Sequence, residues 1–190
     1  RVAGLDPALL AFRLLDPHCR VAVRLAEGAD AGAGDVIARV TGSARALLTG
    51  ERTALNLLGR LSGIATATRD VVARLEGLPT RVVCTRKTTP GLRALEKHAV
   101  RVGGGSSHRY GLDDAVLVKD NHVALAGGIA EAVRRARAGA GHMLKVEVEV
   151  DTLDQLDEAL AVGVDAVLLD HMDLEALAEA ARRSRGRAVT

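Results

Sequence analysis

Cationic side chains gather between residues 84 and 122, where the chain reads CTRKTTPGLRALEKHAVRVGGGSSHRYGLDDAVLVKDNH. The cations of this stretch that could do chemistry are Arg86, Lys87, His108, Arg109, Lys119 and His122. They lie beside turn-forming residues such as Pro90 and the glycines 103–105, instead of along one helix face. Loops held by a scaffold concentrate binding groups, and clustered arginine and lysine suit anionic oxygens. The spacing predicts a pocket for a substrate with several negative charges, and an ordinary basic surface is the alternative.

Two carboxylates could face these cations. Glu149 lies in the alternating segment LKVEVEV, and Asp170 directly follows the apolar run AVLL. Lys119 also follows an apolar run, and residues at such strand ends form the catalytic face of α/β barrels. Acidic residues at the ends of successive strands can hold Mg²⁺ through their oxygen atoms. Acids for a metal and cations for anions together suggest a phosphorylated, metal-bound substrate.

Other motif interpretations of the same stretch fit less well. The segment GGGSSH lacks the strand, lysine and spacing of a Walker loop or a dinucleotide-binding fingerprint. His108 and His122 lack the paired spacing of zinc ligands. Cys84 could be a nucleophile next to basic residues, but the sequence favours a small core side chain at a strand end.

The elements that must position these residues alternate from residue 80 onward. Short apolar runs predict strands in RVVCT, DAVLVKD, LKVEVEV, AVLLD and RAVT. Helical patterns lie between them in PGLRALEKHAV, GGIAEAVRRARA, TLDQLDEALAVG and LEALAEAARR. Helix ends are predicted from Thr89 before Pro90, from Thr152 with Gln155, and from Gly163. This rhythm predicts parallel βα units.

The segment LKVEVEV carries the strongest strand signal. Val146, Val148 and Val150 point to one face, and Lys145, Glu147 and Glu149 point to the other. Helices would cover the valine face, whereas burying unpaired carboxylates on the second face would cost too much. A barrel with a polar, functional lumen resolves this conflict, and an edge strand with one wet face is the alternative.

Residues 1–49 read as short extended pieces and turns, with strands expected in VAVRLAEG and DVIARVTG. A long helix is expected from about Arg52 to Leu75, between Gly50 and Gly77. One of its faces presents Arg52 near Asn56 and Gly63, which could contact a ligand or could equally be a solvated face.

Composition narrows the class of protein. The 190 residues are 48% hydrophobic and 26% charged, with no apolar run long enough to span a membrane and no signal peptide. Two cysteines cannot form a disulfide framework, so a cytoplasmic location is expected. A formal charge of +2 and only two aromatic residues argue against a nucleic-acid partner. The chain begins at Arg1 and ends within the apolar run RAVT, which we interpret as truncation of a longer protein at both ends.

The segments ERTALNLLGRLSGIAT, TRKTTPGLRALEKHAVRVGGG, SHRYGLDDAVLVKDNH, KVEVEV and VLLD, in this order, resemble quinolinate phosphoribosyltransferase. The resemblance covers nearly everything from Gly50 to Asp170. It implies a small, sandwich-like α/β domain with a connecting helix at residues 1–63 and a seven-stranded α/β barrel at residues 64–190. It also implies a homodimer in which each subunit completes the partner's active site.

The reaction that this resemblance implies joins quinolinate to phosphoribosyl pyrophosphate, with Mg²⁺ as cofactor. The products are nicotinate mononucleotide, pyrophosphate and CO₂, a step of NAD biosynthesis. By the same resemblance, Arg52 would reach the partner's site and hold a quinolinate carboxylate. The anion pocket would be lined by Thr85, Arg86, Lys87, His108, Arg109 and Lys119. Glu149 and Asp170 would hold the ribose hydroxyls or the magnesium ion. We expect the cationic pocket to orient the carboxylates more than to act as an acid, and Lys87 and His108 are the candidates for any residue that protonates the ring carbon.

Some residues depart from the family pattern. Cys84 occupies a position where Asp or Gly is expected, and Ser107 and His171 each occupy a position where Asn is usual. His171 adjoins Asp170 and could alter metal or ribose contacts. The alternatives are a paralogue of the same fold, either linked to molybdate transport or specific for nicotinate, and a non-catalytic anion-binding domain. The complete KDNH segment, with Lys119, favours the quinolinate enzyme.

Overall fold

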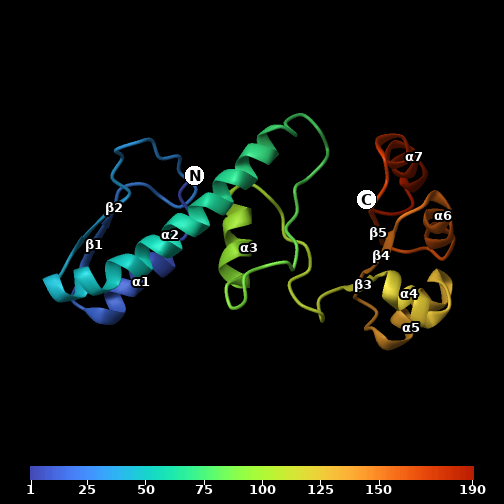
Figure 1. The fold of residues 1–190 in the computed structure, drawn as a ribbon, viewed down its shortest axis with the longest axis horizontal. Helices are drawn as coiled ribbons and strands as arrows, with labels where there is room; N and C mark the ends of the chain where they lie inside the picture. The colour runs from blue at the N-terminus through green and yellow to red at the C-terminus, as the bar shows by residue number, and fades with distance from the viewer. The chain divides into compact units, whose positions relative to one another are not determined.

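Helices and short strands alternate along all 190 residues of the computed structural model (Figure 1). The chain divides into two units, Arg1–His108 and Arg109–Thr190. The first unit contains α1 (Leu5–Leu15), β1 (Arg20–Val23), β2 (Ala38–Thr41), α2 (Ala44–Ala73) and α3 (Arg93–Val102). The second contains β3 (Val116–Val118), α4 (Asp120–Ala126), α5 (Ile129–Gly139), β4 (Val146–Val150), α6 (Leu153–Ala161), β5 (Ala166–Leu169) and α7 (Leu174–Ser184).

The long helix α2 is the central element of the first unit, and both α1 and α3 pack against it. It begins earlier than expected, because the Ser43 side chain accepts a hydrogen bond from the Ala46 amide at 3.4 Å and caps the helix. Gly50 therefore lies inside α2, and the prediction that it precedes the helix was wrong. A Cβ atom at Gly50 would lie 3.0 Å from the Phe12 ring, so this glycine permits close contact between α1 and α2.

Helix α1 lies along α2, and the expectation of only extended pieces and turns in residues 1–49 missed it (Figure 1). Its first amides are capped from a distance, since the Glu27 carboxylate accepts hydrogen bonds from Gly4 N at 2.7 Å and Leu5 N at 3.1 Å. No residue close in sequence announces this cap. The two expected strands are confirmed as the antiparallel pair β1 and β2, in which Val21 pairs with Val40.

Helix α3 lies between two short extended segments, which contain Val83 and Ser106, and it packs against α2. The expected strand RVVCT is reduced to a parallel bridge between Val83 and Ser106. The helix begins at Arg93, after Leu92, so Thr89 and Pro90 lie in the preceding turn, and the predicted cap at this position was wrong. Gly103 ends α3 against α2, where a Cβ atom would lie 2.5 Å from the Ala65 carbonyl oxygen.

The second unit is a parallel sheet with the order β3-β4-β5, and its helices lie on one face (Figure 1). Val118 pairs with Val148, which pairs with Val167. The alternation in β4 is confirmed, because Val146, Val148 and Val150 are fully buried under α5 and α6 whereas the glutamates between them are half-buried. The predicted βα rhythm is therefore present.

A closed barrel is not seen. The second unit has three strands, and a parallel bridge between Ala166 and Val189 adds one extended residue pair beside β5. The mixed α/β class is observed, whereas the seven-stranded barrel and the domain boundary after residue 63 stay predictions. None of the helices is long and apolar enough to cross a membrane.

Candidate functional site

The turn that carries Arg86 and Lys87 is held by its own threonines. The Thr85 hydroxyl accepts a hydrogen bond from Lys87 N at 3.0 Å, and Thr88 N donates to the Arg86 carbonyl oxygen at 3.0 Å. These short-range bonds fix the backbone, so the two cationic side chains start from a defined position. The Nε atom of Arg86 is buried and has no hydrogen-bond partner. A buried donor without a partner is rare and suits an incoming anionic oxygen.

A buried carboxylate on α3 anchors the far side of this turn. Glu96 accepts hydrogen bonds from Thr89 N at 3.1 Å and from Arg60 Nε at 2.8 Å. Burial acts to raise the pKa of Glu96, but the hydrogen bonds from Arg60 and Thr89 outweigh it and leave the pKa below its ordinary value. Sequence reasoning missed both Arg60 and Glu96. A glutamate on the apolar side of α3 was the available signal.

Cys84, at the start of the same turn, is a buried side chain and not an exposed thiol. Its Sγ atom accepts a hydrogen bond from Lys97 Nζ at 2.8 Å. The lysine also reaches the carbonyl oxygen of His108 at 3.4 Å. The structure therefore favours the core interpretation of Cys84 over the nucleophile, and it places Cys84 and His108 on either side of one lysine.

In the second unit, Lys119 and Glu149 come from neighbouring strand ends and form an ion pair. Lys119 Nζ lies 2.6 Å from Glu149 Oε2. The His122 side chain has a different contact, because its Nδ1 atom accepts a hydrogen bond from Lys119 N at 2.9 Å and caps α4. The KDNH segment thus serves partly as a helix start, which the sequence did not indicate.

Asp170 belongs to a second group at the same edge of the sheet, together with Asp151 and His171. The ligand atoms of the three residues lie within 4.8 Å of one another. His171 Nδ1 lies 3.4 Å from Asp151 Oδ1 and 3.6 Å from Asp170 Oδ2. These donors could hold a divalent cation. Sequence reasoning paired Asp170 with Glu149 and missed Asp151, although Asp151 directly follows β4.

The structure therefore sorts the predicted residues by unit. Thr85, Arg86, Lys87 and His108 lie in the first unit, with Arg52 exposed on α2. Lys119, Glu149 and Asp170 lie at the carboxyl ends of β3, β4 and β5 in the second unit, which begins at Arg109. The carboxyl edge of a parallel sheet is where α/β enzymes place their reactive groups.

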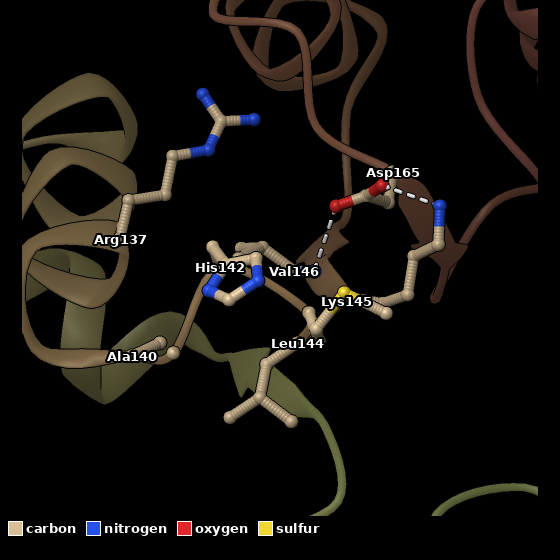
Figure 2. Close-up of a pocket in the computed structure, with 9 residues that line it drawn as sticks. Arg137, Ala140, His142, Leu144, Lys145, Val146 and Asp165 are labelled. Carbon is tan, nitrogen blue, oxygen red and sulfur yellow. Dashed lines mark hydrogen bonds and ion pairs between the residues drawn. The ribbon is translucent and has the colours of Figure 1, made fainter.

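A pocket of about 330 Å³ opens at the opposite, amino-terminal edge of this sheet (Figure 2). Its charged groups already have protein partners: Lys145 Nζ lies 2.8 Å from Asp165 Oδ1, and Arg137 donates to the Gly163 carbonyl oxygen at 2.6 Å. Hydrogen bonds from Lys145 and from Val146 N lower the pKa of Asp165, and they outweigh the effect of burial. The satisfied pairs indicate a role in stability for this edge.

Comparison with known families identifies the chain. Models of the N-terminal and C-terminal domains of quinolinate phosphoribosyl transferase match residues 1–62 and 64–190. The chain belongs to the quinolinate phosphoribosyl transferase family. It is similar to the probable nicotinate-nucleotide pyrophosphorylase (carboxylating) of Synechocystis sp., with 48% identity over 97% of this chain and 62% of that protein. A protein of Bacillus subtilis with the same description is 51% identical over 84% of this chain and 55% of its own length.

A solved structure agrees with this family membership. NadC from Streptococcus pyogenes superposes with a TM-score of 0.93 at 44% identity, over 98% of this chain and 66% of that chain. The chain thus spans about three fifths of the Synechocystis relative and about two thirds of the S. pyogenes chain.

Proposed function

We propose that the protein transfers phosphoribosyl from phosphoribosyl pyrophosphate to quinolinate with decarboxylation, giving nicotinate mononucleotide, pyrophosphate and CO₂ in NAD biosynthesis. The observation that carries the proposal is that both domains of this transferase match along the chain. The turn formed by Thr85, Arg86 and Lys87 (the TRK turn) supports it, because its backbone is fixed by the Thr85 hydroxyl. The proposal includes Mg²⁺ as cofactor, and a cytoplasmic location, which the low cysteine content favours.

The substrates explain why so many cations are needed. Quinolinate has two carboxylates and its co-substrate carries phosphates, and arginine and lysine bind both through charge-assisted hydrogen bonds. Arg86 has the buried, unpartnered Nε atom, and Lys87 is exposed beside it on the same turn. We assign quinolinate binding to these two residues together with His108, Arg109 and Thr85.

Residues at the carboxyl edge of the sheet would bind the ribose of phosphoribosyl pyrophosphate. Departure of pyrophosphate leaves positive charge on the ribose, and a fixed carboxylate nearby stabilises it, as in glycoside chemistry. Glu149 and Asp170 have this role in the proposal. Lys119 holds Glu149 through the 2.6 Å ion pair and so limits the positions that its carboxylate can take. After CO₂ leaves, Lys87 or His108 would supply the proton to the ring carbon.

The group formed by Asp151, Asp170 and His171 fits a divalent cation, because carboxylate oxygens are preferred ligands of Mg²⁺. When bound, Mg²⁺ would neutralise charge on the pyrophosphate and make it a better leaving group. Asp170 would therefore bind the metal or the ribose hydroxyls, and Asp151 extends the predicted ligand set.

The assembly in this proposal is a homodimer of barrels with shared active sites. Arg52 is exposed on α2, in the third turn of that helix, and would bind a quinolinate carboxylate in the partner subunit's site. The parallel bridge at Val189 beside β5 supports further strands in the sheet, as a seven-stranded barrel requires.

The test is an assay of the full-length protein with quinolinate, phosphoribosyl pyrophosphate and Mg²⁺, following pyrophosphate release and the nucleotide product. We expect nicotinate mononucleotide from quinolinate and none from nicotinate. Lys87→Met should abolish most of this turnover, whereas Lys145→Met, the same change at an exposed lysine of the opposite edge, should not. Product from nicotinate alone would overturn the assigned substrate, and no product from either would favour a non-catalytic anion-binding protein.

A further inference from the structure

A buried lysine lies between the two segments that carry the first unit's predicted binding residues. Lys97 is on the inner side of α3 and is only 3% exposed. Lysine is almost never buried to this extent without partners, because desolvating its ammonium group costs several kcal/mol. The desolvation cost of the buried Lys97 ammonium must therefore be offset by hydrogen-bond acceptors around it.

The compensating groups come from the two segments that α3 connects. Lys97 Nζ donates to Cys84 Sγ at 2.8 Å, one residue before the TRK turn, and to the His108 carbonyl oxygen at 3.4 Å. The backbones of these segments also pair, since Cys84 N donates to Ser106 O at 3.1 Å and Ser106 N donates to Val82 O at 2.8 Å. Lys97 thus adds a side-chain link between Cys84 and His108, on the carboxyl-terminal side of the backbone pairing at Ser106.

We propose that Lys97 is a positioning residue that aligns the TRK turn with His108 through Cys84 and the His108 carbonyl. The inference rests on the proposed function for its consequence, because aligned cations are needed to hold the two carboxylates of quinolinate. The lysine itself acts through its neighbours and is not a catalytic residue. Cys84 serves as the sulfur acceptor that keeps the ammonium in place.

A small error in this alignment affects binding more than folding. A charge-assisted hydrogen bond of about 2.8 Å is lost when its donor moves away by about an ångström, so a substrate held by two cations binds less tightly once they move apart. The removal of Lys97 leaves the Cys84 sulfur and the His108 carbonyl oxygen without this donor, which costs less than leaving a buried ammonium without an acceptor would. The expected defect is therefore in quinolinate affinity, with the fold kept.

The experiment compares Lys97→Met, which keeps the apolar stem, with the parent and with Lys145→Met in the full-length protein. We expect Lys97→Met to raise the KM for quinolinate at least tenfold, with a kcat within about threefold of the parent and little change in Tm. Cys84→Val, which removes an acceptor of the buried ammonium, should also raise the KM and should lower the Tm more than Lys97→Met does, whereas Cys84→Ser, which keeps an acceptor, should restore most of the affinity. An unchanged KM for quinolinate in Lys97→Met would overturn the proposal. If Lys97→Met does not fold, the difference between Cys84→Val and Cys84→Ser decides, and equal KM values in these two would overturn it.

Amide hydrogen exchange separates this inference from the proposed function. The Cys84 and Ser106 amides report directly on the pairing of the two segments. In Lys97→Met both should exchange at least tenfold faster, while the Val148 amide in the second unit should not change. If the parent does not turn over quinolinate, the proposed function fails, but faster exchange at Cys84 and Ser106 would still support the positioning role. Unchanged exchange at both amides would refute it.

Discussion

The ion pair between Lys119 and Glu149 offers the sharpest quantitative test of the candidate site. We consider three variants: Lys119→Met, Glu149→Gln and the double variant. Each single change removes one charge and keeps most of the side-chain volume. The double variant removes both charges, so the four proteins form a cycle that isolates the interaction between the two side chains.

The expected magnitude follows from the distance and the exposure. Two unit charges at 4 Å attract by about 1 kcal/mol in water and about 4 kcal/mol at a surface-like dielectric. The two atoms here are 2.6 Å apart, but Lys119 is 43% exposed and Glu149 is 14% exposed, so water screens the pair from the lysine side. Holding a lysine side chain also costs rotamer entropy. We expect a coupling free energy of about 1 kcal/mol, and a loss of about 1–2 kcal/mol for Lys119→Met, which leaves Glu149 without its partner.

The assay is urea denaturation of all four full-length proteins, with the m-value checked for constancy. A second cycle at Lys145 and Asp165 is the matched control, because that pair has a similar distance of 2.8 Å but a lysine that is 78% exposed. The control coupling should be smaller than the coupling of Lys119 with Glu149. A Lys119–Glu149 coupling within about 0.3 kcal/mol of zero would show that the pair does not form in solution. It would refute the idea that Lys119 limits the positions of the Glu149 carboxylate.

Other perturbations follow from single contacts. Gly103→Ala should lower the free energy of unfolding by about 1–3 kcal/mol in thermal or urea melts, because its Cβ would lie 2.5 Å from a carbonyl oxygen of α2; an unchanged Tm would refute this. Because the folded-state pKa of Asp165 is lowered, its stabilisation is full above the unfolded pKa of about 4 and is lost as pH falls through the folded pKa, so the advantage over Asp165→Asn should shrink in acid unfolding curves. Lys87→Ala should weaken quinolinate binding by about 2–3 kcal/mol in calorimetry, and parent-like affinity would misplace the pocket. Mixing Arg52→Ala with Lys87→Ala subunits should restore part of the activity once exchange is shown, and no recovery would contradict a shared site.

Local sequence patterns predicted the parts of the fold that depend on neighbours along the chain. Thr152 caps α6 as expected, since its hydroxyl accepts from Gln155 N at 3.2 Å. The Gln155 side chain bonds Asp151 N at 2.7 Å, one residue before the position that the capping-box pattern predicts. Gly163 follows α6 with a φ of 72°, the left-handed conformation that favours glycine after a helix.

Patterns failed where distant residues decide the local structure. Helix α1 depends on Glu27, which lies beyond the helix and the strand that follows it, and no local rule reports such a cap. Gly50 looked like a helix boundary because glycine is a weak helix former, but contact with Phe12 makes its small size useful inside α2. The partners Arg60 and Glu96 were missed for the same reason, since they come from different helices.

The sequence predicts which residues form the candidate site better than it predicts which of them form ion pairs. Strand β4 shows how the core and the ion pairs depend on the same register. The parallel register that places Val118 beside Val148 also places Lys119 next to Glu149. A slip of one residue would bury a glutamate under α5 and α6 and would place Lys119 beside a valine, so the same register fixes both the core and the ion pair. The alternation of valine and glutamate therefore contains the information that the charged face needs a partner. The identity of that partner appears only once the neighbouring strand is placed, which is why Lys119 was assigned to the anions from sequence and to Glu149 from structure.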